Sequence, residues 1–379
     1  MTSYDYIVVG AGVIGSSTAY ALAKQGKSTL LLEQFPIPHT RGSSHGGSRV
    51  TRKAFRLQEF HSQIMMKAYP MWETLEKEAR VELFKYAQRV GMLSTTHSCH
   101  EGLIKYFTKQ PKLLNSKDVS QMYPLMTLPE NEMAHLDEDA GILYASKCVM
   151  AFQKVFLSNG GVIKDNCKVR SIIPGDTVTV HTDDGDFQAK GLVLACGPWS
   201  SEILSNIGVF LPLKARTVDV CYWKERPGYD HSKLPAFVSL LENCIIYGVP
   251  PSEYNGLMKI TLHDSVPCES ADTRDITDDE LVARNLDKLK KYVASTFPHL
   301  IPEPAIRERC MYTITPDTVS IIDSHPTYKN IVFGAGFSGQ GFKFAPVAGS
   351  MLADLVQNKT PDLLVDEMRA SRFVTKSKL

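Results

Sequence analysis

The order of apolar and polar positions predicts a strand–helix–strand unit near the start of the sequence. A short apolar run at Tyr6–Val9 leads through three glycines into a helical segment at Ser16–Lys24, and a second apolar strand follows at Ser28–Leu32. Apolar strands that alternate with helices are typical of a parallel sheet. The two strands are therefore expected in the same sheet.

Similar patterns return farther along the chain. A buried apolar strand is predicted at Gly191–Cys196, and another at Asn330–Gly334 runs into a helix at Phe342–Gln357. Between them, three strands of a second sheet are predicted at Val218–Trp223, Cys244–Gly248 and Leu257–His263. An amphipathic helix with an acidic start and a basic end is predicted at Asp278–Ser295. A Gly/Ser-rich stretch, Thr40–Ser48, is expected to lead into a helix.

These patterns predict a mixed fold, α/β and α+β. A Rossmann-like layer is expected to be discontinuous, built from residues 1–82, 141–212 and 317–379. A second domain, residues 83–140 and 213–316, is expected to be inserted between these parts and to carry a large mixed or antiparallel sheet.

Composition excludes several classes of partner and site. Lys plus Arg (42) nearly equals Asp plus Glu (41), so neither a nucleic-acid groove nor a surface for an anionic membrane is expected. No apolar run approaches the roughly 20 residues that span a bilayer. The eight cysteines contain no Cys-x-x-Cys pair, so neither a metal site nor a disulfide framework is predicted.

The glycines of the first unit predict a dinucleotide site. Gly10 permits a tight turn, Gly12 lets the backbone approach a pyrophosphate, and Gly15 allows close packing of helix and strand. A pyrophosphate would then lie at the N–H groups that begin the helix. Glu33 ends the second strand, where its carboxylate can accept hydrogen bonds from a ribose.

Cationic side chains suggest an anion site, although each has a simpler interpretation. His45, Arg49 and Arg52 are spaced i, i+4 and i+7, so a helix would place them on one face; a solvated basic face is the alternative. Lys259 and His263 share one face of a predicted strand, which is either the floor of a site or a wet edge strand.

Two further residues are candidates at the end of the chain. Lys343 falls in the first turn of the last helix, where the helix dipole disfavours a positive charge, so a function for that charge is expected; a surface lysine is the alternative. Cys310 is a lone cysteine, and such residues are more often structural than reactive.

Taken together, the sequence resembles the sarcosine oxidase and L-pipecolate oxidase family of FAD-dependent amine oxidases, over almost its whole length. The motifs that carry this resemblance are Gly10–Gly15, Pro38–Gly46, Tyr247-Gly248, Gly256–Lys259, Cys310–Thr313 and Gly334–Gly339. Within the family, the animal peroxisomal sarcosine/pipecolate oxidases are the most similar group.

The resemblance implies FAD, joined covalently through the Cys310 sulfur to the 8α carbon of the flavin. Catalytic roles are implied for Lys259 in oxygen activation, for His263 in positioning the amine, and for Arg49 and His45 beside the flavin. Arg52 and Lys343 are expected to bind the substrate carboxylate, and Tyr247 and Tyr312 to line the substrate cavity. The other residues expected to contact FAD are Gly10, Gly12, Val13, Ile14, Gly15, Glu33, Gln34, Ser43, Ser44, Ser48, Val169, Gly197, Trp199, Gly339, Gln340, Gly341 and Phe342.

The implied reaction converts a secondary amino acid, such as sarcosine or L-pipecolate, into an imine while O2 becomes H2O2. Gln340 departs from the histidine that the family often has there, which leaves substrate preference and pH profile open. The alternatives are a flavin oxidase of another amine, such as a glycated or D-amino acid, an NAD-dependent dehydrogenase, or a flavin-binding protein without turnover.

The printed sequence ends in Ser377-Lys378-Leu379, a tripeptide typical of peroxisomal import. It predicts peroxisomal location and binding to the import receptor. Besides this receptor, only a small-molecule amino-acid substrate and O2 are expected as partners, and the resemblance implies a monomer.

Overall fold

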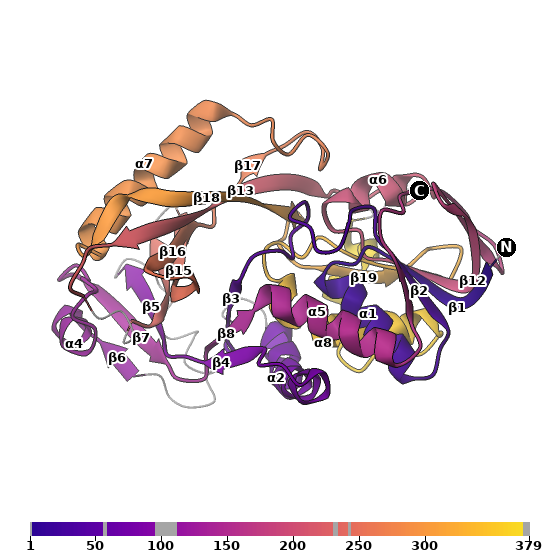
Figure 1. The fold of residues 1–379 in the computed structure, drawn as a ribbon, viewed down its shortest axis with the longest axis horizontal. Helices are drawn as coiled ribbons and strands as arrows, with labels where there is room; N and C mark the ends of the chain where they lie inside the picture. Colours follow the sequence, from indigo (N-terminus) through magenta and orange to yellow (C-terminus); the bar gives the residue numbers. More distant parts are fainter. Residues whose placement is uncertain (1, 56–58, 95–111, 230–233, 242–243, 374–379) are drawn as a thin grey trace.

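The computed structural model describes residues 2–55, 59–94, 112–229, 234–241 and 244–373. Two large sheets lie along the longest axis of the molecule, and helices cover one side of the first sheet (Figure 1). Both Ser377-Lys378-Leu379 and Cys99 lie outside the described residues. None of the described helices is long and apolar enough to cross a membrane.

The first sheet combines segments from three parts of the chain. Its strands follow the order β10–β11–β12–β1–β2–β9, with β20 paired to both β12 and β19. In β1 (Thr2–Val9), Val8 faces one apolar core while Ile7 and Val9 face another, which is why the strand is apolar on both sides. The other strands are β2 (Thr29–Leu32), β9 (Val162–Lys164), β10 (Val169–Ile173), β11 (Val178–Thr182), β12 (Gly185–Leu194), β19 (Ile321–Ser324) and β20 (Ile331–Ala335).

Four helices pack together on one face of this sheet around one apolar core: α1 (Val13–Lys24), α2 (Glu59–Ala79), α5 (Ala145–Ser158) and α8 (Gly341–Val356). The contact between α1 and α8 is close, because a Cβ on Gly349 would lie 2.3 Å from the Ser17 hydroxyl. The same hydroxyl donates to Ala345 O at 2.8 Å.

The second sheet is mixed, since β14 and β5 run parallel and the other described pairs are antiparallel. Its order is β17–β13–β16–β15–β14–β5–β7–β6, and β18 pairs with β13. Its strands are β5 (Arg89–Ser94), β6 (Lys112–Leu114), β7 (Glu132–Asp137), β13 (Lys214–Glu225), β14 (Ala236–Leu241), β15 (Cys244–Tyr254), β16 (Leu257–Leu262), β17 (Val266–Pro267) and β18 (Leu300–Ile314).

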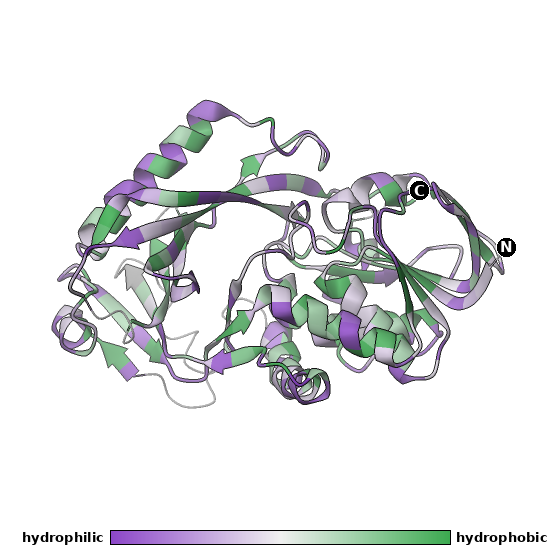
Figure 2. Cartoon of the chain, in the orientation of Figure 1, coloured by the Kyte–Doolittle hydropathy of each residue, from purple (hydrophilic) through white to green (hydrophobic). Residues whose placement is uncertain are grey.

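Helix α7 (Asp279–Thr296) covers one face of the second sheet, and its hydrophilic and hydrophobic residues alternate (Figure 2). Leu289 and Val293 join the core that contains Ile260 of β16. The remaining elements are β3 (Ser48–Thr51), β4 (Phe84–Tyr86) and β8 (Gly141–Tyr144) of a small sheet, α4 (Ser116–Met122), α6 (Ser200–Ser205), and 3₁₀ turns at Gly197–Trp199, Asp366–Met368 and Ala370–Phe373.

The structure corrects several local predictions. The helix predicted after the Gly/Ser-rich stretch is α2, but it does not begin directly: residues 48–51 form β3, which pairs with β8, so His45, Arg49 and Arg52 do not share a helix face. The strand predicted at Gly191–Cys196 is the second half of a longer strand, β12, which begins at Gly185 and ends at Leu194. Helix α7 has acidic residues in its first turn as predicted, but no basic residue in its last turn. Both α5 and the long strand β18 were not predicted, and β18 contains the Cys310 motif.

Candidate active site

A cavity of about 940 Å³ lies where the two large sheets meet. The ends of β1, β2 and β12 contribute Val9, Leu32 and Ala195, and the second sheet contributes Lys259 and Cys310. Ligand sites in open α/β sheets occupy this position, outside the carboxyl ends of the strands. All the predicted site residues line the cavity except Gly15, which packs beneath the glycine turn.

The glycine turn between β1 and α1 leaves no room for side chains. Gly10 has a φ of +99°, and a Cβ on it would lie 2.5 Å from Ala195 O. A Cβ on Gly15 would lie 1.8 Å from Gly10 O. Without side chains the turn can lie directly against the end of β12, and the first turn of α1 opens onto the cavity. Backbone N–H groups at such a helix start favour an anionic ligand.

Two side chains fix the turn from the opposite side. Glu33 is 7% exposed, and its Oε2 accepts a hydrogen bond from Ala11 N at 2.9 Å while its Oε1 accepts one from Phe35 N at 3.1 Å. A carboxylate has about four acceptor positions, so these two bonds leave capacity for a ligand hydroxyl. The Ser44 hydroxyl accepts a hydrogen bond from Val13 N at 2.9 Å.

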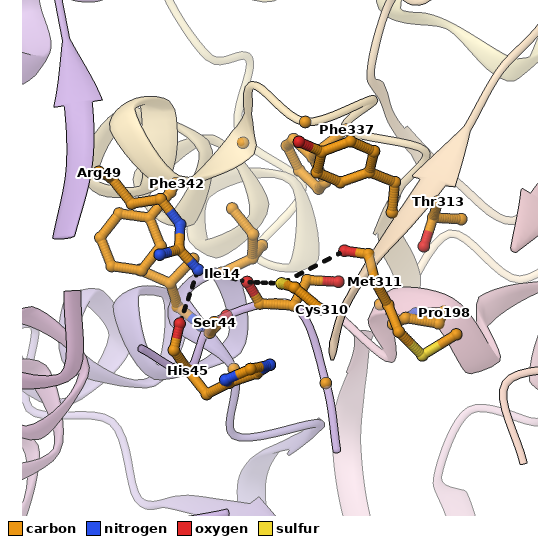
Figure 3. Close-up of a pocket in the computed structure, with 18 of the residues that line it drawn as sticks. Ile14, Ser44, His45, Arg49, Pro198, Cys310, Met311, Thr313, Phe337 and Phe342 are labelled. Atoms are coloured by element: carbon orange, nitrogen blue, oxygen red, sulfur yellow. Dashed lines mark hydrogen bonds between the residues drawn. The ribbon is translucent and has the colours of Figure 1, made fainter. Parts of the chain in front are cut away.

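Arg49 shapes the loop that crosses the middle of the cavity. Its guanidinium donates to Ser43 O at 3.0 Å, His45 O at 2.7 Å and Ser48 O at 2.7 Å. The guanidinium carbon also lies 5.3 Å from the centre of the Phe342 ring, and Figure 3 shows the two side chains side by side. Arg49 therefore closes the loop on itself and brings a fixed positive charge to the cavity wall.

Cys310 lies close to this loop. The thiol is 6% exposed, with Sγ 3.8 Å from Ser43 O (Figure 3). Burial raises the pKa of the thiol, but a hydrogen bond with His45 and the charge of Arg49 outweigh burial and lower the pKa to about 7. A substantial fraction of Cys310 is therefore a thiolate at neutral pH.

Arg52 and Lys343 provide the cations at the other end of the cavity. Both lie over the Phe55 ring, with Arg52 Cζ at 4.5 Å and Lys343 Nζ at 5.8 Å from its centre. Burial, together with the charges of Arg52, Arg49 and Arg89, lowers the pKa of Lys343 to about 7. Burial and Arg89 lower the pKa of Arg52 to about 10. An anionic ligand would relieve this repulsion.

Polar aromatic groups face the same space from the second sheet. His263 Nδ1 lies 3.2 Å from the Tyr312 hydroxyl, which lies 3.4 Å from the Tyr247 hydroxyl. Burial and the charges of Lys343 and Arg52 lower the pKa of His263 to about 4, so its ring is neutral at pH 7. A Cβ on Gly339 would lie 2.8 Å from the His263 ring, so the Gly339 backbone closes one side of this space.

Lys259 is 5% exposed on the face of β16 that points into the cavity. Its neighbours Met258, Ile260 and Leu262 point into the core instead, as the predicted alternation requires. The strand lies between β13 and β15, so it is not the edge strand considered as an alternative. The Nζ atom donates to Ser48 O at 3.2 Å.

Sequence reasoning missed Glu253, which pairs with Lys259 at 3.0 Å, and the buried pair of Arg89 and Asp137 at 2.8 Å. Glu253 lies between Pro250-Pro251 and Asn255-Gly256, a composition that favours a surface turn. Arg89 and Asp137 meet because β5 and β7 pair in that register, and nothing local in the sequence reveals it.

Some buried polar atoms at the cavity have no hydrogen-bond partner within the described residues. Among the described residues, the buried atoms His45 Nε2 and Gln340 Oε1 have no hydrogen-bond partner. Both residues line the middle of the cavity, where a ligand with polar ring edges would satisfy them. Within the described part of the chain, no group of His, Cys, Asp or Glu has the arrangement of a metal site.

The sequence is similar to known proteins over most of its length. A family model described as FAD dependent oxidoreductase matches residues 5–355. The chain is 41% identical to the peroxisomal sarcosine oxidase of Homo sapiens, covering 98% of this chain and 96% of that protein. It is 32% identical to the monomeric sarcosine oxidase of Bacillus sp. (strain NS-129), covering 93% of each.

The fold is also that of NikD, an unusual amino acid oxidase essential for nikkomycin biosynthesis. The TM-score is 0.85 at 21% identity, covering 97% of this chain and 98% of NikD. This likeness concerns the fold alone, and it confirms the predicted mixed fold class. The family matches confirm the predicted resemblance and the prediction of an FAD-dependent amine oxidase. The chain therefore belongs to the sarcosine oxidase family of FAD-dependent oxidoreductases.

Proposed function

We propose that this enzyme oxidises the carbon–nitrogen bond of secondary amino acids, N-methylated or cyclic, and passes the electrons to O2. Sarcosine and L-pipecolate are the first candidates, with an imine and H2O2 as products. The observation that carries this proposal is the pairing of two cations, Arg52 and Lys343, over one aromatic ring. The neutral His263 lies in the same cavity. Such a site suits one carboxylate next to an uncharged amine.

The residues present fit FAD. The glycine turn and the start of α1 suit the pyrophosphate, and Glu33 suits the ribose hydroxyls. The unpartnered atoms of His45 and Gln340 suit the polar edges of the ring system, which Phe342 and Arg49 would flank. When bound, FAD supplies the acceptor for the hydride that leaves the substrate carbon.

The substrate carboxylate would bind Arg52 and Lys343, which fixes the position of the reacting carbon. His263 has a pKa of about 4, so it can accept a hydrogen bond from the amine without repelling it. The Tyr312 hydroxyl holds the ring of His263 at 3.2 Å, and Tyr247 extends this polar wall. Lys259 provides a positive charge that favours electron transfer to oxygen.

Cys310 is proposed as the point of covalent attachment. Its thiol pKa of about 7 gives the thiolate that bond formation to the 8α methyl carbon of the flavin would need. The Cys310→Ala variant is expected to lose all covalent cofactor, which is measured as the yellow colour left in the pellet after acid precipitation. Cys196→Ala is the matched control, because Cys196 also lines the cavity but burial raises its pKa to about 12. Colour that stays with the Cys310→Ala pellet would place the attachment elsewhere.

The visible spectrum during anaerobic addition of sarcosine and then L-pipecolate tests the activity itself. Bleaching by either amino acid supports the proposal and ranks the substrates. A yellow protein bleached only by a glycated or D-amino acid would favour the alternative oxidase. Colour that no amine bleaches would indicate a flavin protein without turnover, and a colourless protein that reduces NAD would indicate a dehydrogenase.

We also propose a monomer that works in peroxisomes. The names of the human and mouse relatives support the location, and that of the bacterial relative supports the oligomeric state. The tripeptide Ser377-Lys378-Leu379 is the candidate signal for the import receptor. Loss of peroxisomal fluorescence when these residues are deleted from a tagged protein would support this, and light scattering measures the molecular mass.

A further inference from the structure

A buried carboxylate lies next to Lys259 at the end of β15. The Glu253 side chain is 8% exposed and accepts hydrogen bonds from Lys259 Nζ at 3.0 Å, the Tyr222 hydroxyl at 2.6 Å, Gly47 N at 2.7 Å and the Ser48 hydroxyl. Burial raises the pKa of Glu253, but Lys259 and the hydroxyl donors outweigh burial and lower it to about 2. Glu253 is therefore an ionised group that faces a lysine of the cavity wall.

The hydrogen bonds continue from Glu253 through Tyr222 to Glu308, which also lines the cavity. The Tyr222 hydroxyl also lies 3.2 Å from Glu308 Oε2, and Glu308 Oε1 accepts from the Tyr254 hydroxyl. Glu308 is half-buried and its neighbour Tyr254 is 37% exposed, so solvent can reach Glu308 itself at this end of the row. A row of hydrogen bonds thus connects the surface with Lys259, through two carboxylates and one hydroxyl.

The number of protons available for these hydrogen bonds determines the direction in which a proton can move along the row. The Tyr222 hydroxyl has one proton but touches two carboxylates, so it cannot donate to both at once. When Glu308 takes up a proton from solvent, it can donate to Tyr222, which donates to Glu253, which accepts from Lys259. Every bond then has one donor and one acceptor. The hydroxyl can pass its own proton to Glu253 while it accepts the next one from Glu308.

The sheet holds these groups in register. β16 and β18 both pair with β13, so Tyr222 and Lys259 are opposite partners and Glu308 lies on the other neighbouring strand. The rings of Tyr222 and Tyr254 meet edge to face at 4.8 Å. The residues of the row therefore belong to paired strands rather than to loops.

The proposed reaction needs a separate route for a proton. Oxidation of the carbon–nitrogen bond releases two electrons and two protons, and reduction of O2 to H2O2 takes up two of each. The hydride carries one proton together with the electron pair. The other proton leaves the amine, and an equivalent one must reach the oxygen by another route.

We propose that Glu308, Tyr222 and Glu253 form a proton relay from solvent to Lys259, which donates the proton to the reduced oxygen. This inference rests on the proposed function, because it assigns the reaction of O2 to the neighbourhood of Lys259. In each turnover, Lys259 gives one proton to oxygen and takes one from Glu253. Glu253 takes its proton from the Tyr222 hydroxyl, the hydroxyl takes one from Glu308, and Glu308 takes one from solvent. The three relay groups end each turnover unchanged.

The competing role for Glu253 is to balance the charge of Lys259, and it predicts the opposite result. If Glu253 only compensates charge, Glu253→Gln would leave the lysine cation unscreened and speed the reaction with O2. If Glu253 carries protons, the same variant slows this reaction, because an amide cannot relay them. The amide keeps one oxygen, which can still accept from Gly47 N in the place of Oε2, while its NH2 group can donate to the Ser48 hydroxyl in the place of Oε1.

The test uses holoenzyme reduced with stoichiometric dithionite and mixed with O2, so it does not depend on which amino acid is the substrate. Glu253→Gln and Tyr222→Phe are both expected to reoxidise at least about tenfold more slowly than the wild type. Tyr254→Phe is the matched control: it also removes a hydroxyl bonded to Glu308, but on the solvent side, and is expected to stay within about twofold. An unchanged or faster Glu253→Gln, or an unchanged Tyr222→Phe, would overturn the relay.

A measurement without turnover separates proton transfer from a structural role. The ammonium hydrogens of Lys259 are expected to exchange with D2O more slowly in Tyr222→Phe than in the wild type or Tyr254→Phe. NMR of protein labelled with ¹⁵N-lysine follows this exchange, and the Lys259→Met variant identifies the signal. Equal exchange in all three proteins would contradict the relay. Failure of every amino acid to reduce the enzyme would instead refute the proposed function and leave both relay measurements intact.

Discussion

The two ends of the cavity are built in different ways. At the end proposed for the dinucleotide (the dinucleotide end), one strand, a glycine turn and one helix meet an acid that follows the next strand, all within residues 2–33. At the end proposed for the reaction (the reaction end), Arg52, Lys259 and Lys343 come from three distant parts of the chain and meet only in the folded protein. The first end depends on local backbone geometry, and the second depends on strand register and on the buried charges.

Mutations at the two ends are therefore expected to have different effects on the enzyme. Damage to the glycine turn is expected to remove the cofactor and with it every activity. Damage to the reaction end is expected to leave the cofactor bound while it slows one step of the reaction. The predictions below test whether the two ends are separable in this way.

The largest effect is expected for Gly10→Ala. Its φ of +99° disfavours a side chain, and the new Cβ would lie 2.5 Å from Ala195 O, so the turn has to move away from β12. We expect nearly complete loss of bound FAD, measured as the ratio of visible to ultraviolet absorbance. Gly26→Ala is the matched control, because Gly26 also has a positive φ, +71°, but no atom lies within 4 Å of the new Cβ. Equal FAD loss in both variants would mean that backbone strain alone is responsible.

A large effect on a single step is expected for Lys259→Met. Loss of the buried cation should slow reoxidation by O2 by about 10²–10³-fold, since a preorganised charge of this kind contributes that much to catalysis. Reduction by substrate should change little, because Arg52 and Lys343, the proposed carboxylate ligands, are unchanged. Stopped-flow absorbance measures the two half-reactions separately. Equal slowing of both would show that Lys259 does not act on oxygen alone.

Sequence reasoning placed residues correctly at the cavity where they belong to a continuous segment. The glycine turn and Glu33 could be predicted because each has a backbone task that depends on near neighbours. The alternation in β16 also placed Lys259 and His263 on the cavity side, since one face of that strand is apolar. A shift of one residue would have turned both side chains into the core.

Sequence reasoning failed where pairing partners decide the structure. The spacing of His45, Arg49 and Arg52 suits a helix, but pairing with β8 makes residues 48–51 a strand, and the guanidinium of Arg49 turns back to its own loop. Glu253 lies in a turn-like stretch, and only the contact with Lys259 distinguishes it from a surface acid. Long-range contacts of this kind leave no periodic pattern in the sequence.

The smallest effect, and the sharpest test of the reaction end, is the pH dependence of carboxylate binding. Burial and the charges of Arg52, Arg49 and Arg89 lower the pKa of Lys343 to about 7, whereas a bound carboxylate raises it. Binding is therefore coupled to proton uptake: the affinity is at its maximum below pH 7 and falls as the pH rises through 7. Arg52, with a pKa of about 10, and His263, with a pKa of about 4, do not titrate in this range.

The expected result is a dissociation constant for acetate that rises by up to about tenfold per pH unit between pH 7 and 9. Perturbation of the visible spectrum of the holoenzyme measures this constant. Lys343→Met should bind acetate more weakly and without this pH dependence, because the titrating group is gone while Arg52 remains charged. A wild-type constant that does not change over this range would show that Lys343 stays protonated in the free enzyme. The cations of the reaction end would then be stabilised by the surrounding protein before any anion binds.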